Sequence, residues 1–318
     1  MTGLSSPYLP VVNAKPTAHH FAVKKRAICP DATAGPSALT YETLTYRPYC
    51  ISEGFGFVAA GGHASELFVR GRSKINNSLC FSSCRRILPS DLCKREPPGD
   101  THLIQSNNDC SIRIFNIPDT SPRLEIVSEW VQELHFEEAI NYSAVSPDST
   151  MIVSVGDSCN VHLIASNSAR SQYSSDYGFG CAWSESSLHF AVCSQDGNVF
   201  VWDVRSTSHP LAKLKSVVPK AACRTVKFTR CGFSELLMFS EHQSYVHIVD
   251  ARTYQEEQVI HATLDGEECT SEQIVDITGI AFSNERSARG SPRYGKSGIY
   301  EYRLDTSARR TFYSTSIA

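Results

Sequence analysis

The sequence predicts an all-β fold, and three observations support this prediction. Apolar and polar residues alternate over short runs along most of the chain, which is the pattern of half-buried β-strands. One arrangement recurs several times, and it consists of a polar turn followed by an apolar run. The chain of 318 residues contains no long run with the period of an amphipathic helix.

The clearest copy of this arrangement is residues 194–206, SQDGNVFVWDVRS, in which a polar turn around Asp196 leads to an alternating run that ends near Trp202. Asp109 and Asp157 occupy the same place in two other copies. An Asp side chain in a turn accepts hydrogen bonds from nearby groups and thereby stabilises the turn. We therefore predict that the three Asp residues lie in equivalent turns between second and third strands, and that Trp202 is buried between repeated units.

Six copies can be recognised, of which the first is weaker and the last is partial. They are residues 60–71, 106–117, 154–165, 194–206, 240–252 and 295–305. A further alternating segment precedes most copies, so each unit reads as strand, turn, strand, turn and strand, followed by a variable linker. The spacing between copies is about 38 to 53 residues, which suits a propeller blade and is too long for leucine-rich or ankyrin repeats.

The VWDV run that follows SQDGN resembles a WD-repeat blade, a four-stranded antiparallel sheet packed around a central channel. The resemblance covers most of residues 40–305, although only one copy has the full Trp-Asp ending and none has a clear Gly-His opening. It implies a WD-repeat-type β-propeller. Six copies and one blade completed from the opposite terminus would make seven blades, because such closure removes the open sheet edge.

The repeats define the expected domain organisation. Residues 1–38 are rich in Pro, Ser, Thr and Ala and lack a strand pattern, so we expect a disordered N-terminal tail before a propeller of residues 39–305. Residues 85–101 contain a Pro-Pro-Gly run that a central strand would not accept. We interpret them as a surface loop, with contact to a partner as the alternative.

The last unit is irregular. Residues 284–298 are basic and rich in Gly and Ser, without the expected apolar run. Either these residues form a long loop, or the last blade lacks a strand and is completed from elsewhere in the chain. Residues 306–318 then form either a C-terminal tail or the segment that closes the propeller.

Composition excludes several classes of partner and site. The net charge is −3, so the chain lacks the basic character of a nucleic-acid-binding protein. It shows no secretory signal and no apolar run that could span a membrane, and we expect a cytoplasmic or nuclear protein, or both. Its 12 cysteines should then be reduced, and several lie on apolar strand faces. A zinc site at Cys80, Cys84 and Cys93, with His63 or His102, is the alternative, but no C-x-x-C pair supports it.

No catalytic motif stands out. The sequence lacks G-x-S-x-G, H-E-x-x-H and a Gly-rich phosphate loop before a helix. We therefore predict a non-enzymatic protein without cofactor or metal that binds other proteins. A propeller-based hydrolase or lyase is the alternative from another class, and it would need carboxylates or histidines that converge around the channel.

Residues 297–314, together with the IVDITGIAFS run before them, resemble the C-terminal signature of a family of fungal WD-repeat proteins. That family includes a yeast substrate receptor of the GID (CTLH-type) ubiquitin ligase. The resemblance implies ligase subunits and degradation substrates as partners, recognition of substrate N-termini at one mouth of the propeller, and docking through the C-terminal residues. The candidate docking residues are Arg309, Arg310, Phe312 and Tyr313.

A second set of residues indicates another class of partner. Arg205 and Arg252 end matching Asp-x-Arg runs in neighbouring units, and such endings resemble those of propeller receptors of cullin-4 ubiquitin ligases. Two arginines on one rim could recognise carboxylates of a partner. The alternative is that each forms a local ion pair, in which case a generic WD-repeat scaffold is sufficient.

Overall fold

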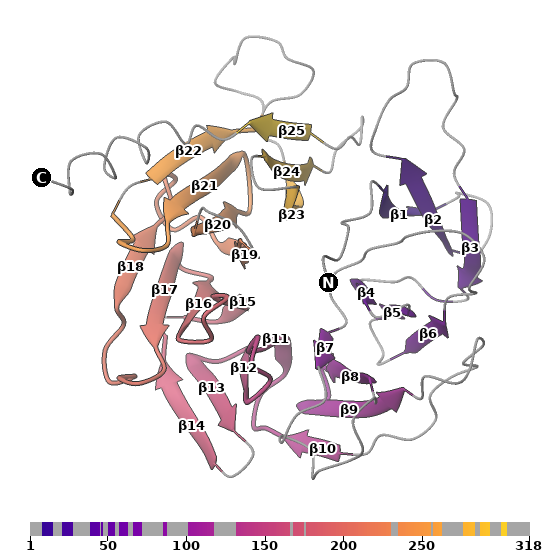
Figure 1. Ribbon diagram of the computed structural model, residues 1–318, viewed down its shortest axis with the longest axis horizontal. Helices are drawn as coiled ribbons and strands as arrows, with labels where there is room; N and C mark the ends of the chain where they lie inside the picture. Colours follow the sequence, from indigo (N-terminus) through magenta and orange to yellow (C-terminus); the bar gives the residue numbers. More distant parts are fainter. Residues whose placement is uncertain are drawn as a thin grey trace, which may run out of the picture. The chain divides into compact units, whose positions relative to one another are not determined.

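The structure is a computed structural model of the whole chain. It describes residues 8–14, 21–27, 39–44, 46, 50–54, 57–62, 66–71, 85–87, 101–117, 132–165, 168–174, 176–229, 235–255, 257–262, 276–283, 287–292 and 300–303. Within these ranges the regular structure is entirely β, as the alternating pattern predicts (Figure 1). No helix among the described residues has the length and apolar character that crossing a bilayer requires.

The described strands form seven sheets, and in each sheet the strands follow one another in chain order. The first three sheets are β1–β2–β3, β4–β5–β6 and β7–β8–β9–β10. Their strands are β1 (Tyr8–Ala14), β2 (Phe21–Ala27), β3 (Leu39–Leu44), β4 (Cys50–Gly54), β5 (Phe57–Gly61), β6 (Leu67–Gly71), β7 (Arg85–Ile87), β8 (Thr101–Ser106), β9 (Ser111–Ile117) and β10 (Gln132–His135).

The later sheets are β11 to β14, β15 to β18, β19 to β22 and β23 to β25. Their strands are β11 (Ile140–Val145), β12 (Met151–Gly156), β13 (Asn160–Ala165), β14 (Ser168–Tyr173), β15 (Gly178–Trp183), β16 (His189–Ser194), β17 (Asn198–Asp203), β18 (Ala212–Lys215), β19 (Cys223–Phe228), β20 (Leu236–Glu241), β21 (Tyr245–Asp250), β22 (Glu257–His261), β23 (Ile277–Ser283), β24 (Ser287–Pro292) and β25 (Tyr300–Arg303). Several antiparallel sheets of this kind are consistent with a β-propeller.

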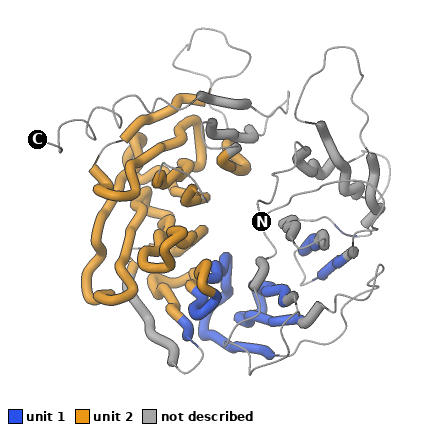
Figure 2. Tube along the Cα trace, in the orientation of Figure 1, with its two compact units in different colours: residues 1–145, 149–152, 164–168 blue, residues 146–148, 153–163, 169–318 orange. Residues whose placement is uncertain are grey.

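The chain divides into two compact units (Figure 2). Unit 1 comprises residues 1–145, 149–152 and 164–168, and unit 2 comprises residues 146–148, 153–163 and 169–318. The core of unit 1 contains five buried isoleucines at positions 104, 112, 114, 140 and 152. Ile112 and Ile114 of β9 are separated by one residue, which places both on one face of their sheet.

One core cluster of unit 2 lies between sheets β15–β18 and β19–β22. Val199 and Val201 of β17 pack there with Leu237, Phe239 and Val249. The other face of sheet β15–β18 carries a row of aromatic rings. The strand register sets Trp183 opposite Phe190 and Phe190 opposite Trp202. Trp202 is only 1% exposed, and its ring stacks on Phe190 with 5.4 Å between centroids.

Three buried thiols belong to unit 2. Cys181, Cys193 and Cys223 are all free cysteines and fully buried. Burial raises the pKa of the Cys193 thiol well above its usual value, and the neighbouring thiols of Cys223 and Cys181 raise it further. Cys181 donates to the carbonyl oxygen of Val153 at 3.4 Å. These cysteines behave as small core residues, as the sequence predicts.

Three segments differ from the sequence-based expectation. β1 and β2 lie within residues 1–38, where we expected a disordered tail; Pro10 is accepted because β1 is the edge strand of its sheet. Arg85–Ile87, the start of the expected loop, pairs with β8 as β7. Residues 284–298, where we expected a loop or a missing strand, contain β24, which pairs with β23 and β25. Backbone pairing does not need an apolar run. Residues 306–318 lie outside the described residues.

Candidate protein-interaction surface

The predicted turn residues each lie in a turn between two paired strands. Asp109 lies between β8 and β9, Asp157 between β12 and β13, and Asp196 between β16 and β17. Asp196 accepts hydrogen bonds from the backbone N–H and the side-chain Nδ2 of Asn198, at 3.2 and 2.6 Å. Gly197 follows with φ of +83°, a left-handed conformation that glycine adopts without strain.

The Asp109 turn is stabilised in another way. Its carboxylate accepts from Ser111 Oγ at 2.5 Å and from Arg113 Nη2 at 2.6 Å. Desolvation opposes the charged form, but these hydrogen bonds and the Arg113 charge outweigh it, so the pKa of Asp109 lies below its usual value. Asp109 belongs to unit 1, whereas Asp157 and Asp196 belong to unit 2.

The two Asp-x-Arg runs adopt the same geometry on neighbouring sheets of unit 2. Arg205 donates from Nε to Asp203 Oδ1 at 2.9 Å and from Nη2 to Oδ2 at 2.5 Å. Arg252 donates in the same way to Asp250, at 3.2 and 2.7 Å. The hydrogen bonds from Arg205 hold the pKa of the Asp203 carboxyl well below its usual range. Each of the two guanidinium groups therefore forms a local ion pair, which is the alternative that the sequence offers to recognition of a partner.

These pairs nevertheless lie at the surface. The Arg205 side chain is 66% exposed and that of Arg252 is 33% exposed. Large apolar side chains are exposed at the same end of the strands, namely Leu188 before β16 and Leu211 after the Arg205 turn. We call these four residues the arginine surface. Oriented arginines beside apolar side chains are typical of protein interfaces.

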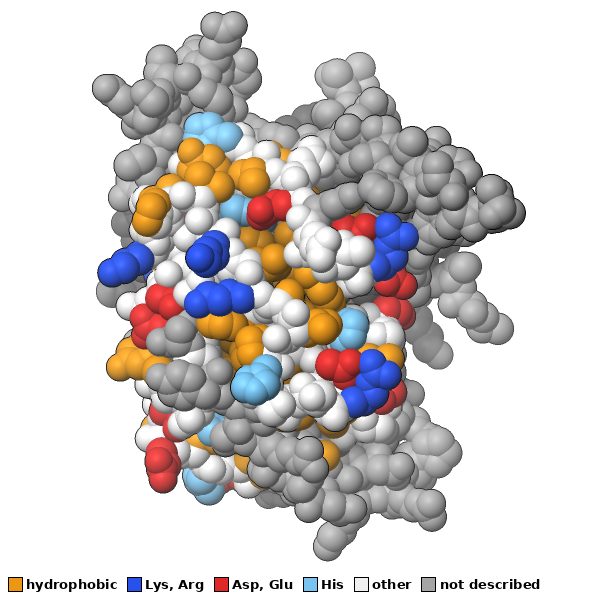
Figure 3. Space-filling view, turned by 90° about the vertical axis from the view of Figure 1, so that its left-hand side faces the viewer, with side chains coloured by type: hydrophobic (Ala, Val, Ile, Leu, Met, Phe, Trp, Pro, Cys, Tyr) orange, Lys and Arg blue, Asp and Glu red, His pale blue; other side chains and the backbone are white. Residues whose placement is uncertain are grey.

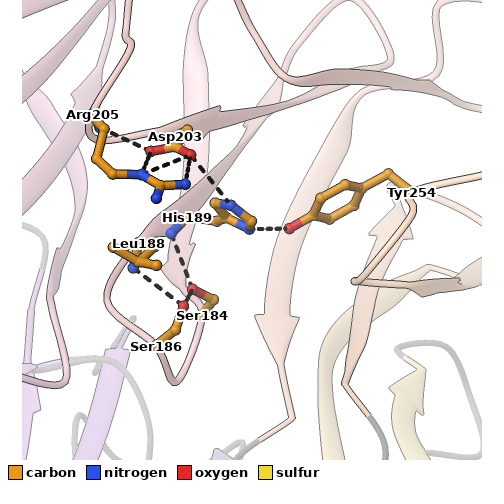
Figure 4. A network of polar contacts seen from close by, with 7 residues as sticks. All are labelled: Ser184, Ser186, Leu188, His189, Asp203, Arg205 and Tyr254. Carbon is orange, nitrogen blue, oxygen red and sulfur yellow. Dashed lines mark hydrogen bonds and ion pairs between the residues drawn. The ribbon is translucent and has the colours of Figure 1, made fainter.

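A polar network stabilises the arginine surface and joins the two sheets (Figure 4). His189 Nδ1 lies 3.0 Å from the Tyr254 hydroxyl, and its Nε2 lies 3.7 Å from Asp203 Oδ2. Burial raises the pKa of Tyr254, and the carboxylates of Glu235, Asp203 and Asp250 raise it further. The hydroxyl therefore stays protonated and can donate to His189.

Serine side chains order the neighbouring turn. Ser184 Oγ accepts from the His189 backbone N–H at 3.1 Å, and Ser186 Oγ accepts from that of Leu188 at 3.3 Å. This turn precedes β16 and holds both His189 and the exposed Leu188. These hydrogen bonds are local, and they hold the turn and its exposed Leu188 in place.

The opposite ends of the same strands carry a second surface. Tyr177, Val217 and Val218 are exposed there, in the connections that precede β15 and β19. Backbone hydrogen bonds join these connections to the β16–β17 turn, from Gln195 N–H to Tyr177 and from Ser216 N–H to Gly197. We call Tyr177, Val217 and Val218 the loop surface.

A buried charged network supports the loop surface. The fully buried Glu241 accepts from the backbone N–H groups of Val217 and Val218, at 2.6 and 3.4 Å. Glu241 also lies 2.8 Å from Nε2 of His247, whose Nδ1 contacts Glu257. Desolvation lowers the pKa of His247, but hydrogen bonds to the two carboxylates outweigh it and raise the pKa overall. The imidazolium is thus stabilised between two acids.

A third surface lies along the outer strands of unit 2 (Figure 3). Apolar side chains run through the middle of the described part of this face, and charged side chains lie on both sides. Val259 of the outer strand β22 is among the exposed apolar residues of unit 2. Lys213 Nζ lies 5.0 Å from the centroid of the Phe200 ring, a favourable contact between a cation and an aromatic face.

The structure tests only some of the predicted contact residues. Arg205 and Arg252 lie on neighbouring sheets in the same arrangement. Arg309, Arg310, Phe312 and Tyr313 lie outside the described residues. Among the described residues, no group of three or more His, Cys, Asp or Glu is arranged so that it could hold a metal.

Comparisons with known proteins support a WD-repeat family. The model of the WD domain, G-beta repeat, matches residues 179–203, which span β15 to β17. The model of an uncharacterised protein domain (DUF2415) matches residues 221–261, which span β19 to β22. The WD-repeat match agrees with the clearest repeat in the sequence and suggests a scaffold for protein–protein interaction.

Two fungal proteins are similar to this chain. Uncharacterized protein C4G3.03 of Schizosaccharomyces pombe is 26% identical over 287 residues, which cover 85% of this chain and 78% of that protein. Uncharacterized protein YLR149C of Saccharomyces cerevisiae is 40% identical over 89 residues, which cover 27% of this chain and 12% of that protein. The chain therefore aligns with only a small part of the budding-yeast relative.

Proposed function

We propose that this protein is a substrate receptor of a GID-type ubiquitin ligase, built as a seven-bladed propeller without catalytic activity of its own. The observation that carries the proposal is the resemblance of residues 297–314 to the C-terminal signature of fungal WD-repeat proteins. The WD-repeat match and the two fungal relatives support the more general role in protein binding. The proposal includes a location in the cytoplasm, the nucleus or both.

The geometry suits such a role because the two ends of the strands offer two different surfaces. A receptor must hold a substrate and the ligase at the same time, so it needs separate contact regions. The arginine surface and the loop surface lie at opposite ends of the same strands. In this proposal, the C-terminal residues Arg309, Arg310, Phe312 and Tyr313 dock to the ligase, since cations beside aromatic side chains are suited to an interface anchor.

The test is affinity purification of the tagged chain from fungal cells, followed by mass spectrometry for ligase subunits. We expect the subunits to co-purify with the full chain and to be lost after truncation behind Asp305. The truncated protein must keep the circular dichroism and melting transition of the full chain. Absence of the subunits from the full chain would overturn the proposal. A cooperative loss of structure on truncation would instead show that the segment closes the propeller.

A cullin-4 receptor is the second candidate, and the matching Asp-x-Arg geometry of Arg205 and Arg252 favours it. We expect the double change Arg205→Ala and Arg252→Ala to abolish capture of the cullin-4 adaptor if this candidate is correct. The same double change should leave capture of GID-type subunits intact. Capture of neither ligase would favour a generic scaffold.

A hydrolase or lyase is the candidate from another class. The described polar network of His189, Asp203 and Tyr254 gives it little support, because the raised pKa of Tyr254 makes its hydroxyl a poor nucleophile at neutral pH. An activity screen of the purified chain with ester, phosphoester and lactone substrates tests this candidate. Turnover that survives in the Tyr254→Phe variant but not in the heat-denatured protein would favour an enzyme with a site elsewhere.

A further inference from the structure

We propose that Arg224, positioned on the ring of Phe179, binds a carboxylate side chain of a protein partner. The inference rests on the proposed function only in assuming that the chain binds proteins, and it does not depend on any ligase. The two residues come from the first strands of neighbouring sheets in unit 2, Phe179 from β15 and Arg224 from β19.

Close packing of these strands places the side chains together. A Cβ atom at Gly180 would lie only 2.8 Å from the Arg224 carbonyl oxygen, so a larger residue there would push β19 away from β15. With glycine in place, Cζ of Arg224 lies 4.2 Å from the centroid of the Phe179 ring. A guanidinium on an aromatic face gains a favourable electrostatic contact and loses conformational freedom. The cation is therefore held in place before any ligand arrives.

Arg224 differs from the other arginines whose side chains are described. Arg113, Arg205 and Arg252 each form an ion pair with a carboxylate, at 2.6, 2.5 and 2.7 Å. In the described part of the chain, Arg224 has no carboxylate within ion-pair distance. The N–H groups of its guanidinium can therefore donate hydrogen bonds to the carboxylate of a ligand.

The surroundings of Arg224 favour an added anion. Loss of water around the guanidinium lowers the pKa of Arg224, and the charge of Asp276 opposes this only in part. A partly desolvated guanidinium interacts more strongly with a carboxylate than a fully hydrated one does. Because the arginine fork matches the two oxygens of a carboxylate, it is suited to a bidentate contact.

Asp276 limits the charge of the ligand. It lies before β23, where Gln243 Nε2 donates to its Oδ1 at 3.2 Å. A ligand with two negative charges, such as a phosphate group, would experience more repulsion from Asp276 than a carboxylate would. An Asp or Glu side chain of a peptide is thus the best match.

Exposed side chains nearby could contact the rest of such a peptide. Tyr177 precedes β15 and is exposed, and His242 lies exposed in the turn before β21. The His242 backbone N–H donates to Ala222, two residues before Arg224, which fixes this turn beside the start of β19. An acidic residue next to an apolar or aromatic one would therefore meet both the cation and apolar surface.

The first experiment measures the site directly on the full chain. Arginine side chains are labelled with ¹⁵N, and N-acetylglutamate α-amide is titrated while the Nε–Hε signals are followed. We expect a saturable shift of the Arg224 signal, assigned with the Arg224→Gln variant, with a Kd on the order of millimolar. The paired Arg205 should not respond, and N-acetylglutamine α-amide should shift neither signal. An unmoved Arg224 signal, or equal shifts of Arg205 and Arg224, would overturn the proposal.

The second experiment asks whether peptides use the site. Random 12-residue peptides on phage are selected against the wild-type chain, Arg224→Gln, Arg224→Lys and the control Arg205→Gln, each with a verified melting transition. We expect Asp and Glu to be enriched with the wild type and the control. The enrichment should fall at least tenfold with Arg224→Gln and less with Arg224→Lys. Equal enrichment with wild type and Arg224→Gln, or none with the wild type, contradicts the proposal. Neither result bears on capture of ligase subunits, so the two proposals fail separately.

Discussion

Sheets β15–β18 and β19–β22 share one strand order but have different interiors. Phe200 of β17 and His247 of β21 occupy equivalent positions in their sheets, as do Ser194 of β16 and Glu241 of β20. Where the first sheet has an aromatic side chain and a small hydroxyl, the second has a buried imidazole and carboxylate. The backbone of one repeat thus accommodates either an aromatic interior or a charged network in which the buried carboxylate and imidazole are hydrogen-bonded to each other.

The two solutions have different consequences. Aromatic stacking around Trp202 depends on shape and burial and is insensitive to pH. The network of His247, Glu241 and Glu257 depends on charge, and it also holds the connection that carries Val217 and Val218. We therefore expect the contribution of sheet β15–β18 to the free energy of unfolding to be independent of pH, and that of sheet β19–β22 to change with pH. The four predictions below test this difference.

The largest effect is expected for Trp202→Ala. Truncation of a fully buried aromatic side chain should lower the free energy of unfolding by about 3–5 kcal/mol, because it removes apolar contacts and leaves a cavity. Chemical denaturation measures this change. Val249→Ala, at the matching position of the other sheet, removes fewer atoms and should cost less. An unchanged melting temperature for Trp202→Ala would show that the strand register is wrong.

The charged network is tested by giving the second sheet the interior of the first. His247→Phe alone should cost about 3 kcal/mol, because it leaves the Glu241 carboxylate buried without its imidazolium. The double change Glu241→Ser and His247→Phe should recover part of this loss. Denaturation of the wild type, both single variants and the double variant gives the coupling energy. Strictly additive effects would mean that Glu241 and His247 do not interact.

The pH dependence of stability should also distinguish the sheets. The pKa of His247 is raised above its usual value of 6.5 in the folded protein, so folding favours the protonated form. This contribution is complete below the unfolded pKa and is lost as pH rises through the folded pKa. Thermal melts from pH 6 upward should show a decline that is smaller in the double variant. An identical decline in both proteins would assign the effect to other groups.

The smallest effect is expected for Tyr254→Phe. It removes the hydroxyl that contacts His189 while keeping the ring, and should cost about 1 kcal/mol, the usual contribution of one hydrogen bond. Denaturation measures the loss, and His189→Phe provides the reciprocal variant. If the double variant loses as much stability as the two single variants added together, the contact between β16 and the turn after β21 contributes no coupling energy.

Much of the fold could be predicted because its signals are local. The turns of Asp109, Asp157 and Asp196 and the alternating runs beside them are visible within about a dozen residues of sequence. β24 was missed because Gly and Ser carry no apolar alternation, although their backbone can still pair. β1 was missed because Pro10 argues against a strand, which holds for central strands but not for edges.

The site residues were harder to predict because their contacts depend on register between distant segments. Glu241, His247 and Glu257 look like unrelated polar residues until β20, β21 and β22 are paired. His247 carried one signal, a polar residue between Val246 and Ile248 in a buried strand. Phe179 and Arg224 meet only because two sheets pack closely at Gly180, and no local pattern indicates this.

The three buried thiols of unit 2 give the protein an internal chemical reporter. Cys181, Cys193 and Cys223 cannot react with an alkylating reagent while they are buried. Their rate of labelling therefore measures how often this core opens to solvent. A partner that binds either end of the strands and stabilises unit 2 should slow the labelling. Binding can thus be followed by mass spectrometry without attaching any dye to the chain.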